Sequence, residues 1–331
     1  MRQHVATFAN FVCRFGEKKV LLDYAKEFVI SAFTDDTLIR EYGHTQFFFY
    51  ETKLVKLSGD PENPILGISG RFIKNTVLTR EQLFDPKRGL VQDEASLSTA
   101  PSAHFVLVLN NHRLIYFPET AHAPDLNAFR STAFHFIQRK RTNFIDARYK
   151  EARDADEKVT KKSLNEIHPS PTLEIVPISG DDEIADFLER YEILKKIEFR
   201  LVKPNDEIDG EELFQDIREY LNPLQPENTK IEIRNSDGLD IDHALPRIQA
   251  ATTTDNQIVK LAGKDHDGND LRGDNHKFQI SAPVDPIPAT RSALTRKLFS
   301  IFSDLANSET IKVPQESQAV TEKIRSLLGL L

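Results

Sequence analysis

The sequence predicts an α+β protein with mixed or antiparallel sheets, a ferredoxin-like βαβ block in its C-terminal half and flanking helices. The main observation lies between Ile197 and Val284, where apolar and charged residues alternate in several short segments. Such alternation is typical of a sheet with one buried and one solvent-facing side. A second observation is the order of strands and helices there, which matches a split βαβ unit. The strand candidates are 197–202, 230–234, 257–262 and 276–281, the helix candidates are 211–221 and 245–251, and 203–206 is a predicted turn.

The N-terminal third is predicted to be rich in strands. Residues 7–15 form an apolar strand candidate, 20–33 have helical spacing, and 46–50 are aromatic residues that favour a buried strand. A further strand is expected at 65–73. The polar span from Asp85 to Ser102 contains Pro86, Gly89 and Pro101 and is predicted to be a loop. Two apolar segments, 104–109 and 113–117, flank Asn110-Asn111-His112 and predict a hairpin.

A basic helical segment follows from Ala128 to about Ile167. Apolar residues recur there at roughly helical spacing, and Pro169 and Pro171 end the segment because proline cannot continue a helix. The second half then begins with a strand at 173–176 and a helix at 181–195, and it closes with amphipathic helices at 291–307 and 318–330. We therefore expect a strand-rich domain at 1–127, a basic helical linker at 128–171, an α+β domain at 172–310 and an apolar helix at 311–331.

Composition indicates an ordinary water-soluble protein. No apolar run approaches the roughly 20 residues that span a bilayer, and the N-terminus lacks the apolar region of a signal peptide, so we expect a cytoplasmic protein. The only cysteine, Cys13, is expected to be a small buried side chain. The net charge of −8 argues against a surface that is basic throughout, although a local basic patch still allows nucleic-acid binding.

The sequence shows no complete catalytic or metal-binding signature, and we expect no cofactor and no small-molecule substrate. The loop 265–270 begins like a calcium loop but has Asp270 where glycine is required, so an Asp-Gly turn between two strands is favoured. Ser69 does not lie in a nucleophile elbow. An alternative is a metal-dependent nuclease that uses one of two groups of carboxylates. These groups are Asp237, Asp240 and Asp242, and Asp265, Asp267 and Asp270.

Two groups of cationic residues are candidates for binding phosphates. The first is the run Arg139-Lys140-Arg141 with Arg148, which is interleaved with Phe134, Phe136 and Phe144. A solvated helix face with internal ion pairs explains this run equally well. The second group lies on the strands and loops of the βαβ block and forms one patch if those strands are neighbours. It consists of Lys230, Arg234, Lys260, Lys264, Arg272 and Lys277.

The second half resembles the RexA phage-exclusion proteins. The matching segments are 199–204, 230–234 followed by Asp237-Gly238, the break at Asn222-Pro223, and 278–283, with an amphipathic helix after them. The resemblance covers about a third of the chain. It implies a non-enzymatic, homodimeric protein that binds double-stranded DNA with little sequence preference and acts with a membrane-protein partner in abortive defence against phage. It also implies a globular domain and a smaller domain that moves against it.

Only Arg234 matches a cationic position of that family, and Ser236 stands where the family has a second cation. Our leading hypothesis is a homodimer that holds duplex DNA in a cleft lined by Arg139, Lys140, Arg141 and Arg234, with cations near Lys264 and Arg272. The nuclease remains one alternative. A protein-interaction module remains another, in which the apolar C-terminal residues Leu327, Leu328, Leu330 and Leu331 make the contact.

Overall fold

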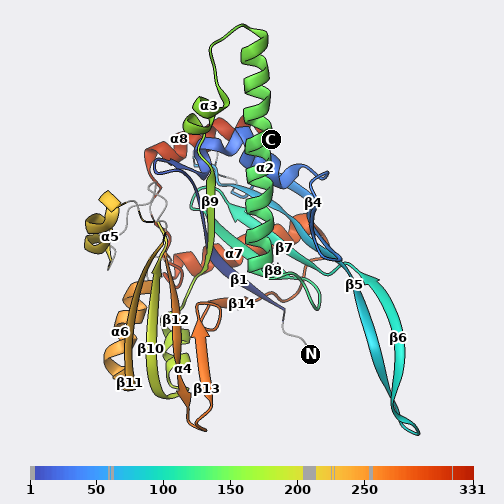
Figure 1. Ribbon diagram of the computed structural model, residues 1–331, viewed down its shortest axis with the longest axis vertical. Coiled ribbons are helices and arrows are strands. Elements are labelled where there is room, and N and C mark those ends of the chain that lie inside the picture. The colour runs from blue at the N-terminus through green and yellow to red at the C-terminus, as the bar shows by residue number, and fades with distance from the viewer. Residues whose placement is uncertain are drawn as a thin grey trace.

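The protein is an α+β structure built on two antiparallel sheets, as the computed structural model in Figure 1 shows. The structure describes residues 4–58, 60, 63–203, 214–224, 226, 228–252, 256–314 and 316–331. Every strand pairing within these residues is antiparallel. The predicted fold class is thereby confirmed. Among the described residues, no helix combines the length and the apolar character needed to cross a bilayer.

The large sheet has ten strands in the described residues, and its main path runs β14-β1-β8-β7-β5-β4-β3. Strands β2 and β9 also pair with β1, and β6 pairs with β5. The strands are β1 (Val5–Phe15), β2 (Lys19–Val20), β3 (Arg40–Tyr42), β4 (Thr45–Lys56), β5 (Leu66–Asp85), β6 (Gly89–Thr99), β7 (Ser102–Val108), β8 (Arg113–Pro118), β9 (Pro171–Pro177) and β14 (Ser281–Pro283).

Helices cover both faces of this sheet because its central strands are apolar on both sides. In β7, Phe105 and Leu107 pack in the cluster that contains α2, while Val106 and Val108 pack in the cluster that contains α7. This division follows the two-residue period of a strand. The first face carries η1 (Leu21–Tyr24), η2 (Ala25–Val29), α1 (Ile30–Thr34), α2 (Leu126–Asp154) and α8 (Gln318–Leu327), and the second carries α7 (Arg291–Asn307).

The small sheet has the order β11-β10-β12-β13 and is covered on one face by α4 and α6 (Figure 1). Its β11–α6–β12 connection crosses over β10, so the expected split βαβ arrangement is present. Gly273 of β13 allows α4 to pack closely, because a Cβ at this position would lie 2.1 Å from Cε1 of Phe187. The elements are α4 (Asp181–Leu188), β10 (Tyr191–Leu201), α5 (Gln215–Leu221), β11 (Thr229–Leu239), α6 (Ile241–Thr252), β12 (Gln257–Asp265) and β13 (Asp270–Asp274).

The polar span predicted as a loop at 85–102 is instead a strand, β6, paired with an extended β5. The prediction was wrong because it gave weight to the residues that break strands. Pro86 and Gly89 lie at the hairpin tip and Pro101 lies between β6 and β7, so the breakers mark the ends of β6 and not its interior. The two strands leave the large sheet as a long hairpin (Figure 1).

Two further elements differ from expectation. The predicted strand at 276–281 is a turn through 275–278 that buries Phe278 against Phe187, and β13 occupies the edge of the sheet instead. The predicted helix at 181–195 ends at Leu188 because Tyr191 already begins β10. The turn at 203–206 and the start of the helix at 211–221 lie largely outside the described residues.

Pairing between strands crosses the expected domain boundaries. Strand β9 pairs with β1 along seven residue pairs, and β14 pairs with the other end of β1. Residues 171–177 and 281–283 therefore belong to the large sheet, and the small sheet with α4 and α6 lies between them in the chain. The first half of α2, placed in the expected linker, packs in the core of the large sheet through Phe129 and Phe136.

Candidate nucleic-acid interface

The open face of the small sheet gathers cationic side chains from all four of its strands. Antiparallel strands place directly opposed residues on the same face. One such row across the sheet is Arg234, Lys196, Ala262 and Arg272. The next rows contain Glu232, Glu198, Lys260 and Asp274, and then Lys230, Arg200 and Ile258. A final pair, Lys264 and Asp270, extends the face along β12 and β13.

This face is distinctly positive compared with the chain as a whole. Its described side chains include seven cations, which are Lys196, Arg200, Lys230, Arg234, Lys260, Lys264 and Arg272, and four carboxylates, which are Glu198, Glu232, Asp270 and Asp274. The formal charge of the chain is −8. The opposite face of the same strands packs Ile197, Phe199 and Val259 against α4 and α6. Packing against the helices therefore requires apolar residues on one face of the sheet, whereas the other face can carry charged residues.

Glu198 organises the centre of the positive face. Its carboxylate lies 3.1 Å from Nζ of Lys196, 3.8 Å from Nζ of Lys230 and 4.0 Å from Nζ of Lys260. The hydrogen bond from Lys196, followed by the charges of the neighbouring lysines, lowers the pKa of Glu198. Lys196 also contacts Glu232 at 2.6 Å. The carboxylate thus holds three ammonium groups in position and offsets only part of their charge.

Arg234 and Arg272 lie at the two ends of the first row and are both exposed. Neither guanidinium forms an ion pair with the described part of the chain. Guanidinium groups bind phosphate through a rigid fork of donors. These two arginines are therefore the side chains of this face best suited to bind a phosphate backbone. Lys264 is less available because its Nζ lies 2.7 Å from the carboxylate of Asp270.

At the end where Arg200 lies, the sheet borders a cleft of about 740 Å³ between the two sheets. Arg14, Arg200, Lys203 and Arg218 line this cleft together with Glu17 and Glu174. Arg200 binds Glu174 at 2.9 Å, and Lys203 binds Glu17 at 2.9 Å. The first ion pair joins β10 to β9, and the second joins the segment after β10 to the turn after β1. Positive charge therefore continues from the open face into the cleft, where carboxylates partly balance it.

The other predicted cations belong to α2, a helix that lies apart from the small sheet, with β9 between the two (Figure 1). Arg141 is buried, and its guanidinium donates to the carbonyl of His168 and to Oδ1 of Asn165, both at 2.7 Å. Lys140 pairs with Asp35 at 2.5 Å, and this contact lowers the pKa of Asp35 to about 2. Arg148 pairs with Glu151, while Arg139 is exposed. The structure does not bring Arg139, Lys140 and Arg141 into one cleft with Arg234.

The aromatic residues interleaved with these cations mostly belong to the core. Phe136 is fully buried, and Phe144 packs against Phe28 and His168. Phe134 is partly exposed. The interleaving therefore reflects the amphipathic pattern of a long helix that packs on the sheet, and it is not a platform for stacking bases. Lys277, the remaining predicted cation, is exposed in the turn after β13.

The carboxylates of the acidic loops accept hydrogen bonds within local turns. Asp265 accepts hydrogen bonds from the backbone N–H groups of Asp267 and Asn269, which builds the expected Asp-Gly turn between β12 and β13. These bonds lower the pKa of Asp265. Asp240 accepts from the backbone N–H of His243 at the start of α6. No cluster of three potential metal ligands is found among the residues that the structure describes.

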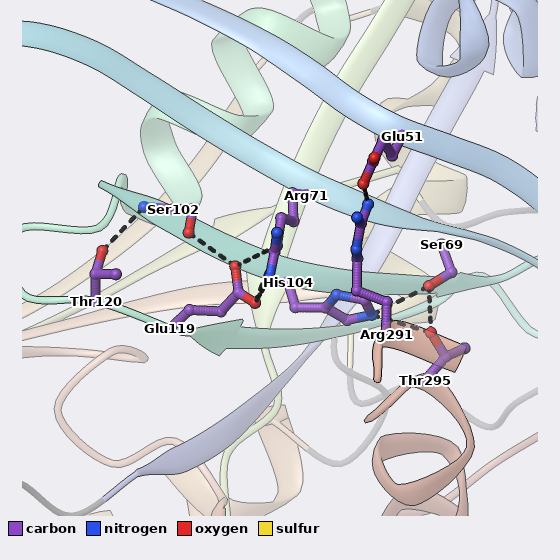
Figure 2. Close-up of polar contacts among 9 residues, drawn as sticks. All are labelled: Glu51, Ser69, Arg71, Ser102, His104, Glu119, Thr120, Arg291 and Thr295. Atoms are coloured by element: carbon purple, nitrogen blue, oxygen red, sulfur yellow. Dashed lines mark hydrogen bonds and ion pairs between the residues drawn. The ribbon is translucent and has the colours of Figure 1, made fainter. Parts of the chain in front are cut away.

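A second polar cluster lies between the large sheet and α7 (Figure 2). Nε2 of His104 lies 3.2 Å from Oγ of Ser69 and 3.0 Å from Oγ1 of Thr295, and the two hydroxyl groups lie 2.8 Å apart. Nearby, Glu119 accepts hydrogen bonds from Arg71 and Ser102. The residues that contact His104 are all buried, so a substrate cannot reach Ser69. This cluster joins strands to a helix and is not a catalytic pair.

Sequence reasoning missed Lys196 and Arg200, which complete the positive face. A signal was available for Arg200, which alternates with apolar residues inside the predicted strand 197–202, whereas Lys196 lies just before that strand, next to the end of the predicted helix at 181–195. It also missed the polar cluster around His104, whose members come from positions 69, 104 and 295. No local pattern connects such distant positions.

Comparisons with known proteins identify no family for this chain. No family model matches its sequence, and no curated protein does so either. The resemblance to RexA proteins therefore rests on the short segments quoted from the sequence.

Proposed function

We propose that this protein binds double-stranded DNA without sequence preference through the open face of its small sheet. The observation that carries the proposal is the shared position of the seven cations on that face, with Arg234 and Arg272 exposed at its two sides. Lysine and arginine side chains that neutralise phosphates release condensed counterions, and this release supplies most of the affinity in sequence-independent binding.

The chemistry of the face favours contacts with the backbone over contacts with bases. Its described side chains are lysine, arginine and carboxylate groups together with Ile258 and Ala262, and they include no aromatic ring. Proteins that hold single strands usually stack bases on aromatic side chains. Sequence readout of a duplex places a helix or a strand ribbon in a groove, whereas this surface is the broad face of a sheet. Phosphate contacts along a duplex therefore fit it best.

The proposal predicts a steep dependence of affinity on salt. We would measure fluorescence anisotropy with two unrelated labelled duplexes over a series of salt concentrations. Neutralising about five phosphates gives a slope of log K against log salt near −4.5, and the two duplexes should bind within about threefold of each other. The double substitution Arg234→Gln with Arg272→Gln should reduce the magnitude of that slope by about 2.

The matched control is Arg139→Gln with Lys150→Gln, which removes two exposed cations from α2. This variant has the same net charge as the sheet variant, so a general electrostatic effect would weaken both equally. Equal loss in the two variants would contradict the assignment of the site to the small sheet. The absence of any binding at low salt would reject DNA binding itself.

A role in a phage-exclusion system, as a homodimer with a membrane-protein partner, extends this proposal and rests on the RexA-like segments of the second half. Its test is the efficiency of plating of phages on a susceptible host that expresses the protein together with its membrane-protein partner. Expression should reduce plating, and the Arg234→Gln and Arg272→Gln variant should restore it. Plating that is unchanged by the wild-type protein across a phage panel would reject the defence role while leaving DNA binding intact.

A further inference from the structure

Strands β5 and β6 form an arm that extends away from the body of the protein, as Figure 1 shows at the lower right. The arm runs from the pair Thr76–Thr99 to the pair Asp85–Gly89, and over this length β5 pairs with β6 alone. A two-stranded ribbon with no third strand and no covering helix is only marginally stable in water. An arm of this kind therefore gains stability when another surface covers it.

One face of the arm carries two exposed apolar pairs. Leu78 lies opposite Leu97, and Phe84 lies opposite Leu90. The exposed fractions are 44% for Leu78, 66% for Leu97, 68% for Phe84 and 71% for Leu90. Leu78 and Phe84 are six residues apart in β5, and β6 has one extra residue at the register shift between Arg80 and Gln82, so directly opposed residues stay together and both pairs lie on the same face. Exposed apolar patches are typical of interaction surfaces, and each pair forms one such patch.

The charge of the arm argues against a polyanion or an anionic membrane as the partner. The arm, residues 76–99, has three cations, Arg80, Lys87 and Arg88, and four acids, Glu81, Asp85, Asp93 and Glu94, so its net charge is close to zero. Among the residues of the apolar face that have a partner directly opposite in the other strand, Arg80 alone is charged. Its guanidinium forms an ion pair with the carboxylate of Asp93. A surface with nearly balanced charge and exposed apolar pairs suits a partner whose surface has the same two properties.

We propose that this partner is the arm of a second copy of the chain, stacked face to face and antiparallel. The two apolar pairs lie about 20 Å apart along the arm, at about 3.3 Å per residue. A twofold axis near residue 81 places Leu78 and Leu97 of one arm on Phe84 and Leu90 of the other, and the same contact forms twice. Such self-complementarity is what a symmetric dimer interface requires.

The direction of stacking follows from Arg80. In the antiparallel arrangement, Arg80 and Ala95 of one arm face Gln82 and Gln92 of the other, and the amide oxygens accept hydrogen bonds from the guanidinium. A parallel arrangement would place the two Arg80 side chains against each other. The inference does not depend on the proposed DNA binding, because the arm and the open face of the small sheet belong to different sheets.

The first test is the mass of the protein in solution without DNA, measured by sedimentation equilibrium. The wild-type protein should be a dimer at micromolar concentration. The variant Leu90→Thr with Leu97→Thr keeps residues that favour strands and should raise the dissociation constant by at least about 100-fold. The control Val77→Thr with Leu83→Thr removes two apolar side chains, each 45% exposed, from the opposite face of the same arm and should leave the dimer intact.

The second test distinguishes stacking of the arms from other modes of association. In the Leu78→Cys and Phe84→Cys double variant, each new thiol faces a thiol of the other copy, at about the 10 Å separation of stacked sheets. A bismaleimide linker of that length should then produce a covalent dimer. Leu78→Cys alone should not, because its two copies lie about 20 Å apart. The native Cys13 is buried, and burial raises the pKa of its thiol, so it does not react.

Circular dichroism and thermal unfolding of each variant would confirm that it is folded. A monomeric wild-type protein would overturn the proposal. A dimer that persists unchanged in the Leu90→Thr and Leu97→Thr variant, or one that Leu78→Cys alone cross-links, would overturn it as well. Loss of DNA binding with an intact dimer would instead affect only the proposed function.

Discussion

Nε2 of His104 in β7 lies 3.0 Å from Oγ1 of Thr295 in α7, although 191 residues separate them in the chain. This contact and that with Ser69 attach α7 to the large sheet. His104 is 1% exposed, and burial lowers its pKa from 6.5 to about 4. Its imidazole is therefore neutral at pH 7 and takes part in a network of uncharged hydrogen bonds.

The buried imidazole predicts that stability falls in mildly acidic solution. The unfolded chain protonates His104 near pH 6.5, whereas the folded protein does so only near pH 4. Between these values the unfolded state binds more protons, so the free energy of unfolding should decrease as pH falls, by about 3 kcal/mol from this residue. Urea unfolding at a series of pH values between 7 and 4 would measure the decrease.

His104→Gln removes the titrating group while an amide replaces the ring as a hydrogen-bonding partner. This variant should lose part of the dependence on pH, and the remainder should come largely from His112, whose pKa burial lowers to about 3. A wild-type protein with constant stability from pH 7 to pH 4 would contradict the burial of both imidazoles.

Arg141 is predicted to contribute to stability and not to DNA binding. Its buried guanidinium donates to the carbonyl of His168 and to Asn165, and Arg141→Ala leaves both acceptors without this donor. The free energy of unfolding should fall by about 2–4 kcal/mol, the cost expected for lost bonds to a charged group. Urea unfolding would measure it.

Arg139→Ala is the matched control, because it removes an exposed arginine from the same turn of α2. It should change stability by less than about 0.5 kcal/mol. If the two variants were equally stable and Arg141→Ala alone weakened DNA binding, the assignment of Arg141 to the interior would be wrong.

The apolar C-terminal residues are predicted to stabilise the fold of their own chain. Leu327 of α8 is buried in the core of the large sheet, with Val320 and Ile324 beside it. Leu327→Ala should lower the free energy of unfolding by about 2–5 kcal/mol through the cavity it creates. Leu330→Ala, at a position that is 53% exposed, should have little effect. Thermal or urea unfolding would distinguish the two.

The alternative in which these leucines form an intermolecular contact makes a different prediction. Leu330→Ala with Leu331→Ala, the two residues that are more than half exposed, would then change the mass in solution. An unchanged mass together with a destabilised Leu327→Ala variant would remove that alternative. Deletion of the whole helix is less informative, because it would also remove part of the core.

Much of the secondary structure was predictable from local patterns. An apolar-rich segment indicated β1, and alternating apolar residues indicated β10, β11 and β12. The spacing of Leu294, Leu298 and Phe302 indicated α7, which was predicted with the same bounds. The strands of the arm were not predicted, because both faces of the arm are exposed. Its part of β5 and β6 therefore lacks the alternation of apolar and polar residues that burial of one face imposes. The helix prediction at 181–195 overran because helical and strand patterns overlap around Tyr191.

For the candidate site, the sequence by itself determined which residues are cationic and that several of them alternate along strands. It could not determine which of those strands are neighbours, because pairing depends on contacts between distant segments. Tertiary structure alone placed Arg234, Lys196 and Arg272 in one row and put Arg141 in the interior. The physical reason is that side-chain periodicity is a local property, whereas the surface on which a charge finally lies is decided by the packing of the whole chain.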